Sequence, residues 1–150
     1  MTVRVQTEDF DAGFEISRLH KNRKDIGAVV SFIGLVRDLN DGDAVSQLTL
    51  EHYPGMTEKS LTSIINQAMA RWSIKDALII HRVGTLQPSD QIVLVAVSGA
   101  HRGEAFAACE FMMDYLKTEA PFWKKEVTPQ GEHWVEAKSA DDAARERWIK

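Results

Sequence analysis

The 150-residue sequence is long enough for one domain with a substantial buried core, and its 44% hydrophobic and 27% charged residues are those of an ordinary globular protein. Asp and Glu outnumber Lys and Arg by 22 to 18, which excludes a protein that coats nucleic acid or an anionic membrane surface by bulk electrostatics. The longest apolar run, residues 92–97, is too short for a membrane helix, and the first residues lack an export-signal pattern, so we expect a cytoplasmic protein.

The first third of the chain alternates strand patterns with polar segments. β-branched or alternating apolar residues predict strands over residues 3–5, 26–36 and 45–53. Residues 11–20 favour a short helix, and Gly34 marks a bulge or a close backbone approach within its strand. The polar, glycine-containing segment 38–43 is typical of a mobile loop, so Arg37 should lie where the second strand ends.

Two later segments have the apolar spacing of amphipathic helices. The first covers residues 57–71, with Thr57 as the expected N-cap. The second begins near His101 and must end near Pro121, because a residue that precedes proline avoids helical angles. Lys117 should therefore lie in the last helical turn.

The remaining segments are typical of hairpins and of a terminal helix. Turn residues join the apolar runs 77–83 and 91–98, and again 122–127 and 133–137, while residues 139–148 favour a helix. Hairpin-connected strands with two long helices between them predict a single α+β domain, residues 1–150, with a mainly antiparallel sheet.

Motif absences narrow the chemistry. The sequence has no phosphate-binding GxxxxGK[ST], no GxGxxG, no GxSxG and no CxxC, and its five histidines lack the spacing of a metal site. We therefore expect neither a metal nor a bound cofactor. The single cysteine, Cys109, lies among apolar residues and is expected to be a buried thiol.

Cationic side chains gather at the predicted ends of strands and helices, where binding sites are usually built. They are Arg37, His101, Arg102, Lys117 and Lys124. His101 and Arg102 stand at a helix start, where the dipole disfavours positive charge unless an anion binds there. The alternatives are that both side chains extend into solvent or pair with an acidic neighbour, and that Lys117 only caps its helix.

Two geometric arguments refine this cationic site. In a strand, Phe122, Lys124 and Glu126 share one face and Lys125 projects to the other, so the two lysines cannot do the same job. A continuous helix from His101 to Lys117 is about 24 Å long, too far for both ends to touch one small substrate. We therefore predict a pocket shared across a homodimer.

Three stretches together resemble the large, catalytic subunit of molybdopterin synthase. They are LTLEHYPGMTEK (48–59), SGAHRGEAFAACEFMMDYLKTEAPFWKKE (98–126) and WVEA (134–137), within a resemblance that runs from about residue 27 to residue 138. This resemblance implies an α/β hammerhead-type fold and a homodimer at the core of a heterotetramer. A small ubiquitin-like sulfur-carrier subunit would sit at each end.

In that family, two sulfurs pass from the carrier's C-terminal Gly-Gly thiocarboxylate to cyclic pyranopterin monophosphate. The product is the dithiolene of molybdopterin, a step of molybdenum cofactor biosynthesis that needs no ATP, metal or cofactor. The resemblance implies that Lys117 and Lys124 are catalytic. It implies a substrate-binding role for Leu35, Val36, Arg37, His101, Arg102, Lys125 and Glu126.

Two other interpretations of the residues remain open. One is a non-catalytic module that binds an anionic ligand or a partner's acidic tail in the same cationic pocket. The other is a lysine Schiff-base lyase acting on a carbonyl substrate through Lys117.

Overall fold

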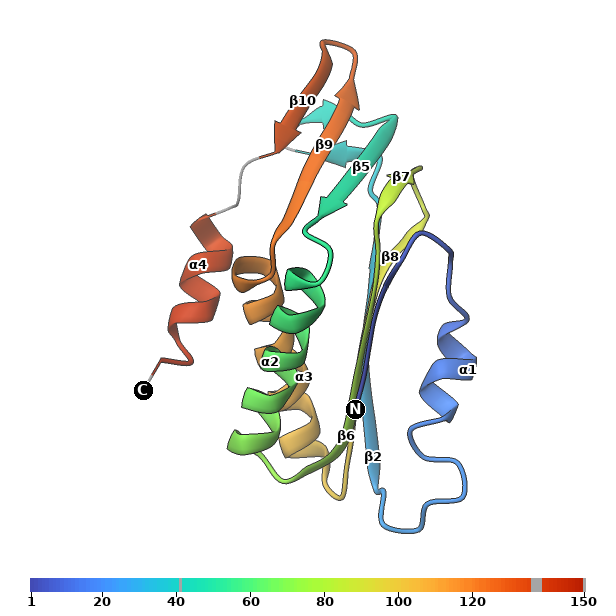
Figure 1. Cartoon of the computed structure of the whole chain (residues 1–150), viewed down its shortest axis with the longest axis vertical. Helices are drawn as coiled ribbons and strands as arrows, with labels where there is room; N and C mark the ends of the chain where they lie inside the picture. The colour runs from blue at the N-terminus through green and yellow to red at the C-terminus, as the bar shows by residue number, and fades with distance from the viewer. Residues whose placement is uncertain (41, 136–138, 150) are drawn as a thin grey trace.

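The computed structural model describes residues 1–40, 42–135 and 139–149. Its elements form two four-stranded sheets, one small two-stranded ribbon and the helices that cover them (Figure 1). The predicted α+β class and the mainly antiparallel pairing are confirmed. No helix in the described ranges is both long enough and apolar enough to cross a membrane.

The larger sheet forms the body of the molecule. Its order is β1 (Thr2–Gln6), β6 (Ile74–Arg82), β8 (Gln91–Gly99) and β2 (Ala28–Leu35). β6 and β8 are antiparallel, as the hairpin pattern predicts, and β2 adds antiparallel to β8 at the edge. β1 pairs in parallel with β6, far from it in sequence, so no hairpin turn constrains its direction.

Helices bury both faces of the two central strands (Figure 1). α2 (Met56–Arg71) and α3 (Arg102–Glu119) cover one face, where their apolar stripes pack on Ile79 and Val95. The segment containing α1 (Ala12–Ser17) covers the other face, where Ile80 and Leu94 contact Phe10. This arrangement explains the continuous apolar runs of residues 77–80 in β6 and 92–97 in β8.

The second sheet packs at one end of the first. Its order is β10 (Gly131–Val135), β9 (Phe122–Thr128), β5 (Gln47–His52) and β7 (Gly84–Leu86), all antiparallel. A cluster of buried side chains joins the two sheets, including Val36, Leu50 and Leu86. The sequence predicts the β9–β10 hairpin correctly but gives no sign that β5 lies between β9 and β7.

Two local predictions are wrong. Segment 38–43 is not simply a loop, because β3 (Leu39–Asn40) pairs with β4 (Asp43–Ala44). Thr57 is not the N-cap of α2, because the helix begins at Met56 and Gly55 (φ 84°) occupies the cap position. The buried Thr57 hydroxyl instead accepts a bond from the Tyr53 backbone N–H and donates one to the Pro121 carbonyl.

Other local predictions are confirmed. The register of β2 shifts between Gly34 and Leu35, and a Cβ at Gly34 would lie 2.9 Å from Val93 Cγ1, which explains the glycine. α3 begins after His101 and carries Lys117 in its last turn. The terminal helix α4 (Ser139–Glu146) is present, and the predicted strand 133–137 is confirmed for residues 133–135, while residues 136 and 137 lie outside the described residues.

Candidate functional site

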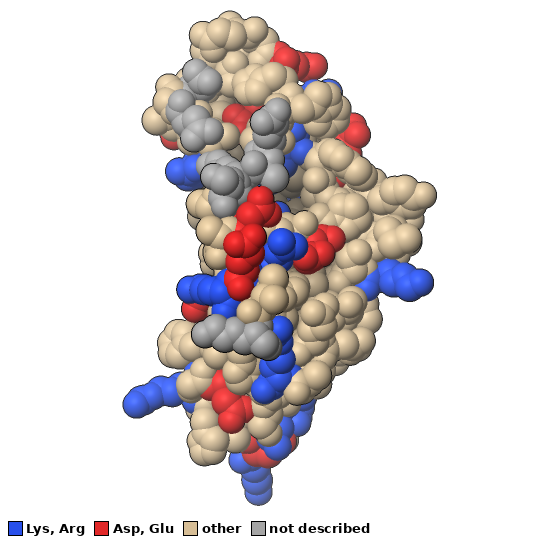
Figure 2. All heavy atoms as spheres, turned by 90° about the vertical axis from the view of Figure 1, so that its left-hand side faces the viewer, with Lys and Arg blue, Asp and Glu red and all other residues tan. Residues whose placement is uncertain are grey.

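A cavity of about 580 Å³ opens where the two sheets meet above the end of α3. Figure 2 looks onto the side of the molecule that carries α4, where Lys and Arg side chains lie beside Asp and Glu side chains around a recess. Six of the predicted site residues line this cavity, namely Leu35, Val36, Arg37, Lys117, Lys124 and Glu126. The fold therefore brings together groups from β2, α3 and β9.

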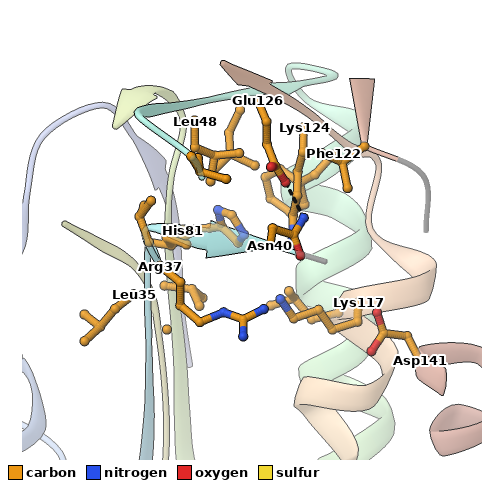
Figure 3. Close-up of a pocket in the computed structure, with 18 of the residues that line it drawn as sticks. Leu35, Arg37, Asn40, Leu48, His81, Lys117, Phe122, Lys124, Glu126 and Asp141 are labelled. Atoms are coloured by element: carbon orange, nitrogen blue, oxygen red, sulfur yellow. Dashed lines mark hydrogen bonds between the residues drawn. The ribbon is translucent and has the colours of Figure 1, made fainter. Parts of the chain in front are cut away.

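The main chain before Arg37 is held firmly. The Val36 backbone N–H donates to the Asp90 carbonyl at 2.9 Å, and the Val36 carbonyl accepts from the Ser89 N–H at 2.8 Å. The Val36 side chain is buried in the cluster between the sheets. The bulge at Gly34 thus redirects a well-anchored strand end, from which the Arg37 guanidinium extends into the cavity (Figure 3).

Lys117 enters the cavity from the opposite wall. The preceding residues of α3, Tyr115 and Leu116, are buried in the core, so the last turn of the helix has a fixed position. The Lys117 side chain points toward Arg37 in Figure 3, and Asp141 of α4 lies close to it. Two cations from distant segments therefore face one another across the space that a small anion would fill.

Lys124 and Glu126 share one face of β9, as strand alternation predicts. β9 lies inside its sheet, where Lys124 is in register with Leu50 of β5 and with Val135 of β10. Lys125 projects to the opposite face, where its ammonium lies 5.6 Å from the centroid of the Trp134 ring. The structure thus separates Lys125 from the cavity-lining group.

The Glu126 carboxylate is buried, with 5% of the residue exposed, and it accepts a hydrogen bond from the Asn40 side-chain amide. This contact attaches the β3 segment to β9. The sequence places Asn40 in a loop and gives no indication that it reaches the site.

His81 is a second cavity residue that the sequence analysis missed. It comes from β6, is 5% exposed, and stacks on Phe122 with ring centroids 3.8 Å apart and an interplanar angle of 19°. Burial, together with the nearby charges of Lys117 and Lys124, lowers the pKa of His81 to about 3. The sequence did contain a signal for this residue. Strand alternation puts His81 on the same face as the core residue Ile79, so a polar ring is expected at a position that otherwise faces the core.

His101 and Arg102 lie at the far end of α3 from Lys117. With about 1.5 Å per residue, the helix separates the two ends by roughly 24 Å. Glu104, the acidic neighbour considered as their partner, accepts a hydrogen bond from the Ser73 backbone N–H. Within one chain, this cationic pair and the cavity are therefore separate.

Cys109 is a buried thiol that packs in the main core. Burial, together with the neighbouring Glu110 charge, raises its pKa to about 11. Within the described part of the chain, no group of three His, Cys, Asp or Glu side chains is placed to hold a metal ion.

Comparison with known proteins shows which family this chain belongs to. The family model described as MoaE protein matches residues 5–119. The chain belongs to the MoaE family. A molybdopterin synthase catalytic subunit from Ralstonia nicotianae is 65% identical over 147 residues, which cover 98% of this chain and 84% of that protein.

Solved structures of the family share the whole MoaE fold. The chain superposes on a molybdopterin biosynthesis MoaE protein from Burkholderia ambifaria with a TM-score of 0.85 and 57% identity, covering 99% of this chain and 98% of that one. It superposes on molybdopterin synthase from Staphylococcus aureus with a TM-score of 0.82 and 34% identity, covering 89% and 96%. The family resemblance predicted from the sequence is confirmed.

Proposed function

We propose that this chain is the catalytic subunit of a molybdopterin synthase. It transfers two sulfurs from the C-terminal thiocarboxylate of a small ubiquitin-like carrier to cyclic pyranopterin monophosphate, forming the molybdopterin dithiolene. The observation that carries this proposal is the convergence of Arg37, Lys117 and Lys124, from three separate elements, on one cavity. The near-full-length similarity to molybdopterin synthase catalytic subunits supports it.

The cavity chemistry suits an anionic, phosphate-bearing substrate. The planar guanidinium of Arg37 can donate two parallel hydrogen bonds to phosphate oxygens. Lys117 can act on the carrier's acyl carbon either as a nucleophile or as a proton donor to the leaving carboxylate. The carrier supplies the activated sulfur, so the buried Cys109 thiol has no part in the reaction. Lys124 adds positive charge to the cavity from β9.

The second cationic group completes the site from another protomer. β2 is an edge strand with exposed apolar residues, including Phe32 and Leu35. The Gly27 N–H donates to the Gly99 carbonyl, so the first end of β2 lies beside the start of α3, and Arg37 follows its other end. Antiparallel pairing of two β2 copies would therefore place His101 and Arg102 of one protomer near Arg37 of its partner.

This assembly defines the partners. A homodimer forms the core of a heterotetramer, and each cavity admits the extended Gly-Gly tail of one carrier subunit. Lys125, on the other face of β9 beside Trp134, has no place in the cavity lining, so any contact it makes with substrate would lie outside the cavity wall. The reaction takes place in the cytoplasm and uses no nucleic acid, membrane, metal or cofactor.

Reconstituted turnover separates this proposal from a binding module. The purified chain is mixed with cyclic pyranopterin monophosphate and with a carrier that ends either in a thiocarboxylate or, as the control, in an ordinary carboxylate. Dithiolene should form only with the thiocarboxylated carrier. Carrier binding without dithiolene would indicate the binding module, and borohydride trapping of substrate on Lys117 would indicate the Schiff-base lyase.

A further inference from the structure

The imidazole of His81 is held in one orientation and one tautomer. Its Nδ1 lies 2.8 Å from the backbone carbonyl oxygen of Arg82, and one face of the ring stacks on Phe122. A carbonyl oxygen can only accept a hydrogen bond, so Nδ1 must carry the proton. Nε2, on the other edge of the ring, is then an unprotonated acceptor.

This ring is uncharged near neutral pH. The residue is 5% exposed, and burial together with the charges of Lys117, Lys124 and His52 keeps its pKa at about 3. A protonated imidazole would present a donor at Nε2 and would add a positive charge to a cavity that already holds several. The site therefore offers a neutral acceptor amid cations.

The cavity thus has two chemically different parts (Figure 3). Arg37 and Lys117 provide donors and positive charge suited to a phosphate. His81 and Glu126 provide acceptors on the part of the wall nearer β9, where Lys124 also lies and the Asn40 amide already bonds to Glu126. A ligand that matches both parts carries an anion at one end and N–H donors on a flat heterocycle at the other.

We propose that His81 is a specificity-determining residue whose Nε2 accepts a hydrogen bond from a ring N–H of the pterin substrate. The inference rests on the proposed function, because cyclic pyranopterin monophosphate combines a phosphate with a donor-bearing pterin ring. Stacking on Phe122 and the bond to the Arg82 carbonyl fix the acceptor before the substrate arrives, so little ordering is needed on binding.

Three substitutions separate this role from a structural one. His81→Phe keeps a flat ring on Phe122 but removes the acceptor. His81→Gln places an amide oxygen near the position of Nε2. His81→Asn can still donate to the Arg82 carbonyl but does not reach that position, so it serves as the matched partner of His81→Gln and replaces His81→Phe if that variant does not fold.

The measurements are the KM for the pterin, the KM for the carrier, and the Kd for the pterin without carrier. Because a substrate donor would be left unpaired, His81→Phe and His81→Asn should raise the pterin KM and Kd by roughly fivefold to a hundredfold. The carrier KM should stay unchanged, and His81→Gln should recover part of the pterin affinity.

The inference is overturned if the wild type is active and a folded His81→Phe or His81→Asn variant binds the pterin as tightly as the wild type does. Equal losses for pterin and carrier without recovery by His81→Gln would also overturn it and would assign His81 a structural role. Failure of the proposed function looks different, because the wild type itself would then produce no dithiolene.

Discussion

Arg37 and Lys117 point toward one another across the cavity, one from the segment after β2 and the other from the last turn of α3 (Figure 3). Two facing cations repel each other. An anion bound between them is attracted to both, and these two attractions offset the repulsion. The geometry of the free protein is therefore already arranged for a phosphate or a carboxylate.

Arg37→Ala should raise the KM for the pterin substrate by about tenfold or more, because a charge-assisted bond to phosphate is worth roughly 1.5–3 kcal/mol. The loss should shrink as salt rises, since salt screens the wild-type contact. Steady-state kinetics at several salt concentrations tests this. Arg23→Ala is the matched control, because Arg23 is an exposed arginine paired with Asp25 at 3.0 Å. A salt-independent loss would remove Arg37 from phosphate binding.

The shared site makes a quantitative prediction for mixed dimers. Arg102→Ala and Lys117→Ala should each be inactive or nearly so, but each mixed dimer would contain one site with both residues intact. Random pairing of equal amounts should restore about a quarter of wild-type activity. Co-expression of the two variants, each with its own affinity tag, followed by a dithiolene assay, measures this fraction. A mixture as inactive as its components would place the whole site within one chain.

Cys109→Ala should keep sulfur-transfer activity close to that of the wild type. The thiol is buried, with a pKa of about 11, so very little thiolate exists at pH 8. The lost packing should cost about 1 kcal/mol of unfolding free energy. Native-state alkylation with iodoacetamide should be slow for the wild type, whereas loss of turnover in a stable variant would show that the thiol takes part in the reaction.

His81 should make the fold sensitive to acid. Its folded pKa of about 3 lies below the ordinary value of 6.5, so the unfolded chain binds the extra proton between these pH values. The stabilisation is complete above pH 6.5 and is lost as pH falls toward 3, at up to about 1.4 kcal/mol per pH unit. Denaturant unfolding from pH 7 to pH 4 should show a shallower pH dependence for His81→Phe. Parallel curves would mean that His81 is not buried in its neutral form.

Local sequence patterns were sufficient for part of the site. Alternation along residues 122–127 separates Lys124 from Lys125, and helical spacing with Pro121 places Lys117 in a last turn, because both depend only on near neighbours. Thr57 looked like a cap for the same local reason. Its actual partner, the Pro121 carbonyl, is distant in sequence.

The rest of the site depends on contacts between distant segments. The insertion of β5 between β9 and β7 brings Leu50 beside Lys124, and the last residues of β6 bring His81 against Phe122. No local periodicity encodes such pairings, because they are decided by how whole sheets pack. The Asn40–Glu126 bond was missed for the same reason.

The central claim is that the cavity around Lys117 performs sulfur transfer, and a single-turnover assay of Lys117→Ala tests it most directly. The lysine contributes only about 0.3–1 kcal/mol to its helix, so the variant should fold and bind carrier normally. Lys59→Ala, an exposed lysine on α2, is the control. The account predicts dithiolene from the wild type and Lys59→Ala but none from Lys117→Ala. A wild-type rate of dithiolene formation in a folded Lys117→Ala would contradict it.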